Sequence, residues 1–363
     1  MNLRLNSIDG TYKGLLVEPA VTNLCKQSED ITTTWSPIQA TLTANDTTAP
    51  DGATTADKLN DDSGGGTGSV YVQQVITVSA ATKYTASVFL KADQLAFAAL
   101  QALNYDGGIS GQQYFGLSGA GSLGTASNLD DSSITAYPNG WYRCSITWTQ
   151  GASDTSFYFR IYLASSISSL TVQLDGTSSI FVWGAQVETG PIATSYIPTT
   201  TAQVQRVKDD ITLGSASSLI GQTEGTLYLE VDWRDASGLR YLLTASDNSV
   251  SDFVNILTGN TNQVRAIARV NNSELCSIEE TGATNTGVTK IAFAYKTNDF
   301  ELYKNGSSLG SVTTGSVVFS SVVDKINLGA YYNDQFQANM WIPAAALYPT
   351  RLSDAEAQAL TTL

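Results

Sequence analysis

The sequence contains no histidine among its 363 residues and only three cysteines, Cys25, Cys144 and Cys276. Without histidine, Ser-His-Asp and Cys-His catalysis, histidine-ligated zinc and an imidazole pH switch are excluded. The cysteines are odd in number, far apart and never spaced as Cys-x-x-Cys. We therefore expect three buried, reduced thiols in a protein made in a reducing cytoplasm, rather than a disulfide framework or a thiolate metal site.

Charged residues are scarce, at 14% of the chain, and their balance is acidic, with a formal net charge of -14. Because an acidic chain without a basic stripe repels a phosphate backbone, we expect no nucleic-acid partner. No apolar run approaches the ~20 residues that a membrane helix needs, so we expect no membrane insertion. The opening MNLRLNSIDG lacks the apolar core of a secretory signal, which argues against ordinary secretion.

Most of the sequence consists of segments in which apolar and polar residues alternate, and clusters of turn-forming residues separate these segments. This pattern predicts an all-β protein with two β-sandwich (jelly-roll) domains in tandem. Asn305-Gly306 predicts a type I′ hairpin turn, and a capping box from Ser353 to Glu356 predicts a short C-terminal helix. The clearest alternating segments are 83–92, 141–149, 157–164, 226–233, 264–270 and 290–296.

The best domain boundary lies in the polar, proline-containing stretch YIPTTTAQVQRVKDD (196–210). It predicts one sandwich over residues 21–203 and a second over residues 204–363, and each is long enough for a complete domain. Residues 1–20 are too short for a domain and are expected to form an N-terminal attachment segment.

Each half of the chain carries an ordered run of recognisable motifs. Those of the first half are GLLVEPAVTNL (14–24), APDGATTADKL (49–59), NGWYRCSITWT (139–149) and IFVWGAQVETGPIATSYIPTT (180–200). With these motifs the first half resembles a module common in tailed-bacteriophage fibre, spike and other virion proteins, which is itself similar to the jelly-roll carbohydrate-binding modules of bacterial glycanases. The motifs of the second half are GTLYLEVDW (225–233) and ALYPTRLSDAEAQAL (346–360), and this half resembles a concanavalin A-like (laminin-G-like) sandwich.

The resemblance implies a virion protein that contacts a host-surface glycan and forms a homotrimer. It would attach to other virion proteins through the N-terminal segment. The leading hypothesis is a non-enzymatic tail fibre, spike or head fibre that binds host polysaccharide. One alternative is a purely structural decoration or tail protein, and another is a polysaccharide-degrading tailspike. We expect residues 1–203 to bind the glycan weakly and residues 204–363 not to bind it.

The segment FYFRIYL supplies the main candidate for a saccharide groove. Strand alternation places Phe157, Phe159, Ile161 and Leu163 in the core. It leaves Tyr158, Arg160 and Tyr162 on the opposite face, where aromatic rings could stack on sugar C–H surfaces and the guanidinium could reach hydroxyls. The alternative is that they are ordinary cross-strand pairs on a solvated or subunit-facing sheet.

Three further residues are candidates for the same role. Alternation in WYRCSITW directs Arg143 outward, beside the expected groove, and Trp141 begins that strand. Trp35 lies in an irregular polar stretch and is a candidate for a loop-borne stacking platform. The alternatives are that Trp141 plugs the end of the sandwich and that Trp35 packs over its edge.

The resemblance also suggests a site for a structural calcium ion, because the related glycanase modules often hold one near the chain termini. The nearest carboxylates are Glu18 and Glu188, but Trp183 stands where those relatives tend to carry acidic residues. We therefore expect no cofactor and no metal ligands, and a structural calcium ion is left as a possibility that the residues do not support.

One motif favours an enzyme. Glu230-x-Asp232-x-x-Asp235 is similar to the Glu-x-Asp-x-x-Glu of retaining glycosidases with a concanavalin A-like fold, which need two carboxyl groups about 5–5.5 Å apart. Asp235 is one methylene shorter than the expected glutamate, and alternation predicts outward carboxylates on a half-exposed strand. We therefore expect no enzymatic activity.

Three pairs of adjacent aspartates lie in turn-like segments and are expected in solvated loops. They are Asp61-Asp62, Asp130-Asp131 and Asp209-Asp210.

Overall fold

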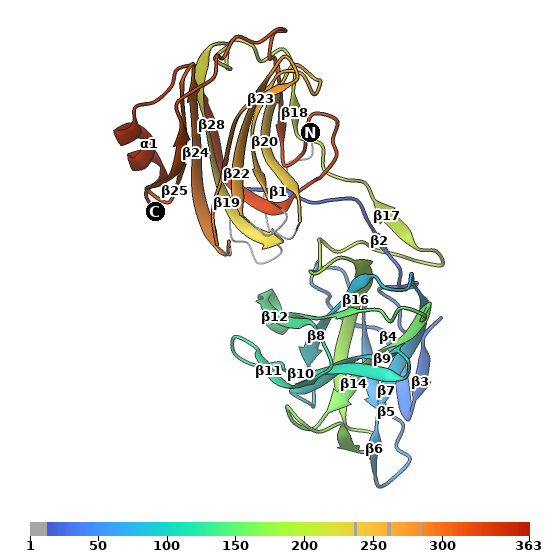
Figure 1. Cartoon of the computed structure of the whole chain (residues 1–363). Coiled ribbons are helices and arrows are strands. Elements are labelled where there is room, and N and C mark those ends of the chain that lie inside the picture. The colour runs from blue at the N-terminus through green and yellow to red at the C-terminus, as the bar shows by residue number, and fades with distance from the viewer. Residues whose placement is uncertain (1–12, 236–237, 260–262, 283–284) are drawn as a thin grey trace. The chain divides into compact units, whose positions relative to one another are not determined.

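The computed structural model describes residues 13–235, 238–259, 263–282 and 285–363 (Figure 1). The chain forms two compact units. The first is Ala20–Arg206, and the second joins Val207–Leu363 to the residues before Ala20. The break after Arg206 falls inside the polar stretch at residues 196–210. Nearly all regular structure is β-strand, which confirms the all-β prediction.

The first unit is a sandwich of two six-stranded sheets. One sheet has the order β11 (Ser122–Ser127), β10 (Ile109–Gly116), β9 (Phe97–Asp106), β14 (Ser156–Ala164), β7 (Tyr71–Thr77), β3 (Ser36–Ile38). The other has the order β12 (Asp131–Tyr137), β13 (Trp141–Thr149), β8 (Lys83–Ala92), β16 (Ser179–Thr189), β5 (Ala56–Asp61), β4 (Ala40–Thr47). Two short pairs join β15 (Thr171–Gln173) to β6 (Thr67–Ser69) and β17 (Val204–Arg206) to β2 (Val21–Asn23).

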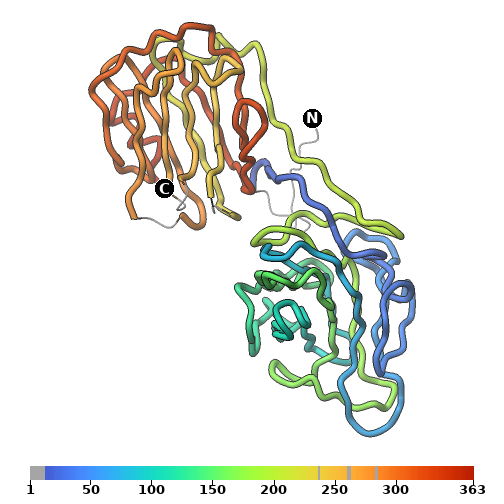
Figure 2. Tube along the Cα trace, turned by 45° about the vertical axis from the view of Figure 1, so that its right-hand side comes forward, coloured from blue at the N-terminus to red at the C-terminus, as the bar shows by residue number. Residues whose placement is uncertain are grey.

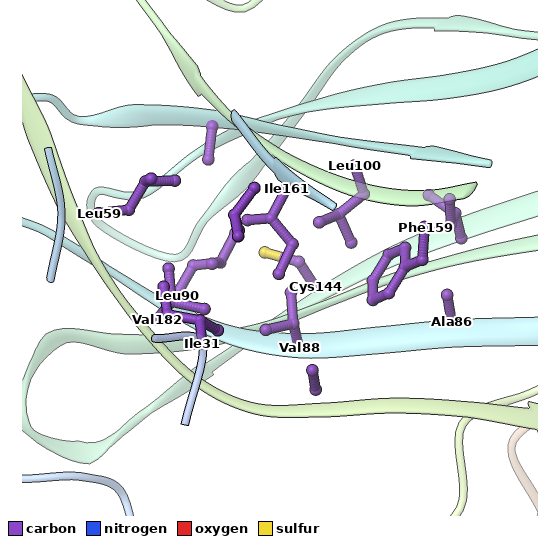
Figure 3. Packing of buried hydrophobic residues seen from close by; sticks show 14 of the residues in the cluster. Ile31, Leu59, Ala86, Val88, Leu90, Leu100, Cys144, Phe159, Ile161 and Val182 are labelled. Carbon is purple, nitrogen blue, oxygen red and sulfur yellow. The ribbon is translucent and has the colours of Figure 1, made fainter. Parts of the chain in front are cut away.

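The core of the first unit lies between its two sheets, as strand alternation predicts. Phe159 and Ile161 of β14 point toward Val88 of β8 in the opposite sheet (Figure 3). Each of these side chains is fully buried. Cys144 of β13 lies in the same cluster. The alternation of apolar and polar residues therefore correctly identified the inward faces of β14 and β13.

The second unit is also a sandwich of two six-stranded sheets. One has the order β1 (Leu15–Val17), β28 (Asn339–Tyr348), β19 (Glu224–Asp235), β24 (Val288–Lys296), β25 (Asp299–Lys304), β26 (Ser307–Val312). The other has the order β18 (Thr212–Leu213), β27 (Lys325–Leu328), β20 (Arg240–Ser246), β21 (Phe253–Thr258), β22 (Val264–Val270), β23 (Ser273–Glu279).

Strand β1 corrects the expectation of a separate segment over residues 1–20. Leu15 pairs with Ile342 and Val17 with Met340, so this part of the chain belongs to a sheet of the second unit. Apolar burial explains this pairing, because the Val17 side chain is fully buried in the core of the second unit. In Figure 2 the chain can be followed from β1 into the first unit and back after Arg206. Residues 1–12 lie outside the described residues, so the attachment role stays a prediction.

Two local predictions of the second unit are confirmed. The helix α1 (Asp354–Thr361) begins with the capping box, in which the Ser353 hydroxyl accepts from the Glu356 amide and the Ser353 amide donates to the Glu356 carboxylate. Asn305 and Gly306 have φ angles of 48° and 81°, as a type I′ turn between β25 and β26 requires.

The cysteines behave as predicted. All three are buried and free. Burial raises the pKa of the Cys276 thiol to about 12 and raises the pKa of Cys25 and Cys144 as well. Of the helices in the described residues, none is both long enough and apolar enough to cross a membrane.

The expectation that all three acidic pairs lie in solvated loops is wrong for Asp61. Its side chain is 1% exposed at the end of β5. The carboxylate accepts hydrogen bonds from the backbone amides of Ser63, Gly176 and Ser178 at 2.6–3.0 Å. Asp61 therefore organises two turns, because it satisfies amides that have no strand partner. Its neighbour Asp62 is exposed, as expected.

Candidate functional site

Strand β14 carries Tyr158, Arg160 and Tyr162 on the face that points away from the core, as predicted. Arg160 is the centre of a polar network: its Nε donates to Gln73 Oε1 at 2.7 Å, and its Nη1 donates to the Tyr162 hydroxyl at 3.0 Å. The guanidinium also lies over the ring of Tyr71, with 4.5 Å between Cζ and the ring centroid. The guanidinium is thereby held in one orientation.

The neighbouring strands complete this network with residues that sequence reasoning missed. Gln101 of β9 stands directly across from Arg160 and accepts from the Tyr162 hydroxyl at 3.1 Å. Its own amide nitrogen donates to Gln112 of β10 at 3.0 Å. This row of glutamines opposite Arg160 carries no sequence motif, because β7 and the β9–β10 hairpin are distant from β14 in sequence and meet it only through the sheet register.

Tyr162 differs from the prediction of an exposed stacking residue. Its side chain is 4% exposed, and its ring lies 4.6 Å from that of Tyr71. Tyr114 and Ala99 belong to the same buried cluster. Burial raises the pKa of the Tyr162 hydroxyl. Tyr162 therefore positions Arg160 and offers no ring face to a ligand.

Tyr158 lies beside a groove of about 460 Å³, which we name the Tyr158 groove. The groove follows the edge of β7, because β3 pairs only with Tyr71–Gln73 and leaves the following residues of β7 without a partner strand on that side. Its lining mixes hydroxyl, amide, ammonium and apolar groups and contains no carboxylate. The lining residues are Leu24, Lys26, Thr34, Ser36, Gln73, Gln74, Val75, Ile76, Thr77, Tyr158 and Gln203.

Gln74 builds the outer wall of this groove. Its side chain is 8% exposed, and its amide oxygen accepts from the backbone N–H of Lys26 at 2.9 Å. Its amide nitrogen donates to the Lys26 carbonyl at 3.0 Å and to the Thr34 hydroxyl at 3.2 Å. One buried side chain therefore fixes the irregular segment around Lys26 against β7.

Several polar groups of the groove keep bonding capacity for a ligand. Tyr158 is half-buried and Lys26 is exposed. Within the described residues, neither the Tyr158 hydroxyl nor the Lys26 ammonium has a hydrogen-bond or ion-pair partner. Gln73 uses its amide oxygen on Arg160, which leaves its NH₂ group to donate. The groove thus offers an aromatic face beside donors of several kinds.

Arg143 does not lie beside the ladder of β14, so that prediction is wrong. It belongs to β13, in the other sheet of the sandwich, because alternation specifies which face a residue takes and not which sheet its strand joins. Its Nη2 donates to the Ser87 hydroxyl at 3.0 Å, and its guanidinium lies 5.4 Å from the ring centroid of Phe89. Its charge also favours the ionised form of the buried Glu188.

Both tryptophans are buried, Trp35 in the core of the sandwich and Trp141 in a separate cluster with Phe89 and Trp183, so the prediction of exposed platforms is wrong for both. Trp141 is 0% exposed, and its indole N–H donates to the Thr48 carbonyl at 3.1 Å. Trp35 is 4% exposed, donates to the Gln27 carbonyl and packs 6.0 Å from the ring of Phe159. Each ring contributes apolar burial instead of a sugar-stacking face.

The carboxylates considered for calcium belong to different units. Glu18, in the second unit, pairs with Arg234 at 2.7 Å. Glu188, in the first, accepts from Thr194 and Gln186, and these hydrogen bonds oppose the rise in its pKa that burial causes. In the part of the chain that the structure describes, no cluster of three acidic or cysteine side chains is placed to hold a metal ion.

The Glu230 motif lies on β19, as predicted, and its carboxylates are half-buried. Glu230 stands across from Lys290 and accepts from the Tyr228 hydroxyl at 3.5 Å. A register shift against β28 separates Glu230 from Asp232, so a bulge interrupts the motif.

No family model matches the sequence, and no curated protein matches it. Solved structures similar to this chain include the CBM40 of the Ruminococcus gnavus IT-sialidase (16% identity, 42% of this chain and 97% of that chain, TM-score 0.35). The NanB sialidase of Streptococcus pneumoniae is similar at 17% identity over 42% of this chain and 26% of that one (TM-score 0.36). A heptameric SAP-like pentraxin from Limulus polyphemus is similar at 13% identity, over 40% of this chain and 70% of the pentraxin chain (TM-score 0.31).

Proposed function

We propose that this chain is a non-enzymatic glycan-binding protein and that the Tyr158 groove holds the saccharide. The observation that supports this most directly is the half-buried ring of Tyr158 beside uncommitted amide, hydroxyl and ammonium groups. A sugar ring has an apolar C–H face and a rim of hydroxyls, so it needs an aromatic surface next to donors and acceptors. A groove of about 460 Å³ is within the range of ordinary ligand sites.

The network around Arg160 supports the proposal because it orders the groove before a ligand arrives. Gln73, which lines the groove, is held by Arg160, and Arg160 is held in turn by Tyr162 and Tyr71. A fixed donor loses little conformational entropy on binding, so a shallow groove can still bind with useful specificity. Most hydroxyl contacts only replace water, so the affinity of one site is weak.

We further propose that the protein is a bacteriophage virion appendage, either a tail fibre, a spike or a head fibre. It is made in the bacterial cytoplasm and binds host-surface polysaccharide. The support is the ordered run of motifs from GLLVEPAVTNL (14–24) to IFVWGAQVETGPIATSYIPTT (180–200). We propose a homotrimer joined to other virion proteins through its N-terminal residues. Several copies on one particle then convert weak single-site binding into firm attachment.

A purely structural role is the competing proposal, and one observation favours it. Trp35, Trp141 and Tyr162, each a candidate for sugar contact, are buried in packing roles. On this view Tyr158 is one more ring on a solvated sheet.

Binding of the full-length chain to an array of neutral and acidic bacterial oligosaccharides separates the two proposals. We expect a defined set of glycans to bind, Tyr158→Ala to lower that binding at least tenfold, and Tyr158→Phe to retain most of it. Ile109→Ala, an exposed apolar residue of the same unit outside the groove, is the matched control. Equal binding by Tyr158→Ala and the control would favour the structural proposal.

A further inference from the structure

The second unit carries an aromatic cluster on the outer face of its sheet β18-β27-β20-β21-β22-β23, which we name the Tyr331 platform. Its rings come from β20, from β21 and from the loop between β27 and β28. Tyr241 and Tyr331 stack at 4.2 Å with an interplanar angle of 28°. The members are Tyr241, Phe253, Tyr331, Tyr332 and Phe336, linked by ring-centroid distances of 4.2–5.9 Å.

Phe336 is the member that packing explains least. Its side chain is 45% exposed, and its φ angle is 52°, in the left-handed region that bulky residues avoid. A phenylalanine in that conformation stores backbone strain, and an exposed ring recovers little of it through burial. Asparagine or glycine would fit this position with less strain. The ring is therefore held outward at a cost to folding.

Positive charge borders the platform. Arg269 of β22 lies with its Cζ 5.2 Å from the ring centroid of Phe253. Arg265 lies four residues earlier on the same face of β22. Its Nε and Nη2 donate to the Ser277 hydroxyl at 3.0 and 2.8 Å, and its ion-pair contacts to Glu274 and Glu279 are long, at 3.9 and 4.0 Å. In a chain with a net charge of -14, two half-buried arginines on the sheet face that carries these rings form an unusual surface, although Phe336 is the one exposed ring of the five.

A buried polar group beneath the same face lacks a partner. Asn255 of β21 is fully buried two residues from Phe253, and within the described chain neither its amide oxygen nor its amide nitrogen makes a hydrogen bond. It stands across from Thr244, whose hydroxyl donates to the Ala330 carbonyl next to Tyr331. The sandwich core does not require this amide, because residues of alternate parity fill the core.

We propose that the Tyr331 platform is a second carbohydrate-binding surface, for a saccharide with an acidic substituent. A sugar ring stacks on Phe336 and the adjoining tyrosines, and its carboxylate or sulfate is drawn to Arg269 and Arg265. The Tyr331 platform belongs to a different unit from the Tyr158 groove, so binding at one does not depend on binding at the other. A glycan on the platform would run against the expectation that residues 204–363 bind none.

The test uses the full-length chain with Tyr158→Ala, so that the first groove cannot account for what is bound. Its probes are oligogalacturonate, oligomannuronate and a sulfated heparin hexasaccharide, with cellohexaose as the neutral comparison, and binding is measured by ligand-observed NMR. We expect at least one acidic probe to bind more tightly than cellohexaose, and we expect Phe336→Asn in this background to weaken it at least tenfold.

Thermal unfolding of the same variants separates a binding role from a structural one. Asparagine relieves the left-handed strain, so Phe336→Asn should leave the melting temperature unchanged or raise it. Val318→Asn, at a position that is 64% exposed in the same unit, should change neither property. A lower melting temperature with unchanged binding, or no binding of any acidic probe by the Tyr158→Ala chain, would overturn the proposal.

Discussion

The guanidinium of Arg160 donates a hydrogen bond to the hydroxyl of Tyr162, two residues along the same strand, at 3.0 Å. Neighbours two apart on a strand share one face, and here one of them is half-buried and the other buried. Arg160 therefore forms the boundary between the packed part of the sheet face and the open part at Tyr158. The first prediction follows from this contact.

Tyr162→Phe removes the hydroxyl that bridges Arg160 and Gln101 and keeps the ring. We expect the free energy of unfolding to fall by about 1 kcal/mol, because two half-buried polar partners each lose a hydrogen bond. Urea denaturation measures this, with Tyr158→Phe as the control that should change stability little. Equal stability of Tyr162→Phe and the unmodified chain would show that the network does not order the groove.

Gln74→Leu should disrupt the groove wall. It leaves the backbone N–H and carbonyl of Lys26 without the partner that holds them against β7. We expect glycan binding to weaken at least fivefold and stability to fall by about 1–3 kcal/mol. Titration calorimetry at a temperature well below unfolding reports binding alone. Full affinity in Gln74→Leu would place the saccharide elsewhere.

Asp57 predicts a pH dependence of stability. Burial raises the pKa of its carboxyl to about 6, although the backbone amides of Asn45 and Ile31 donate to it. The folded state therefore holds a proton that the unfolded state releases near its lower pKa. Asp57 contributes stability that is fully present below pH 4 and is lost as the pH rises through 6.

The size of this loss is on the order of 2 kcal/mol for a rise of about two pKa units. Comparing urea denaturation at pH 4.5 and pH 7 for the unmodified chain and for Asp57→Asn isolates the contribution. The unmodified chain should lose more stability over this interval than Asp57→Asn. Parallel profiles for the two chains would be inconsistent with the raised pKa.

The three thiols should be unreactive in the folded protein. Each cysteine is buried, and burial raises the pKa of Cys276 to about 12, so the reactive thiolate is scarce at neutral pH. We expect no reaction with Ellman's reagent over an hour at pH 8 and three equivalents after denaturation. Rapid labelling of any thiol without denaturant would contradict the burial of these side chains.

Sequence reasoning succeeded where the evidence is local. The alternation of β14 identified Phe159 as core and Tyr158 as outward because side-chain period is a property of one strand. The capping box at Ser353 and the turn at Asn305 are equally local and were also predicted correctly.

The same reasoning failed where a residue's role depends on distant partners. Alternation could not show that Tyr71 and Tyr114 would cover Tyr162, or that Arg143 would join the opposite sheet. The groove itself brings Lys26 against β7 and β14, which are about 50 and 130 residues further along the chain. Long-range pairing of this kind depends on sheet register, which no single segment encodes.

The most direct measurement is a crystal structure of the full-length chain with the tightest-binding oligosaccharide from the array. The account predicts a sugar ring stacked on Tyr158, with hydroxyl or charged substituents within hydrogen-bonding distance of Gln73 and Lys26, while Tyr162 stays buried against Tyr71. A saccharide bound away from Tyr158, with the groove left to solvent, would contradict the central claim.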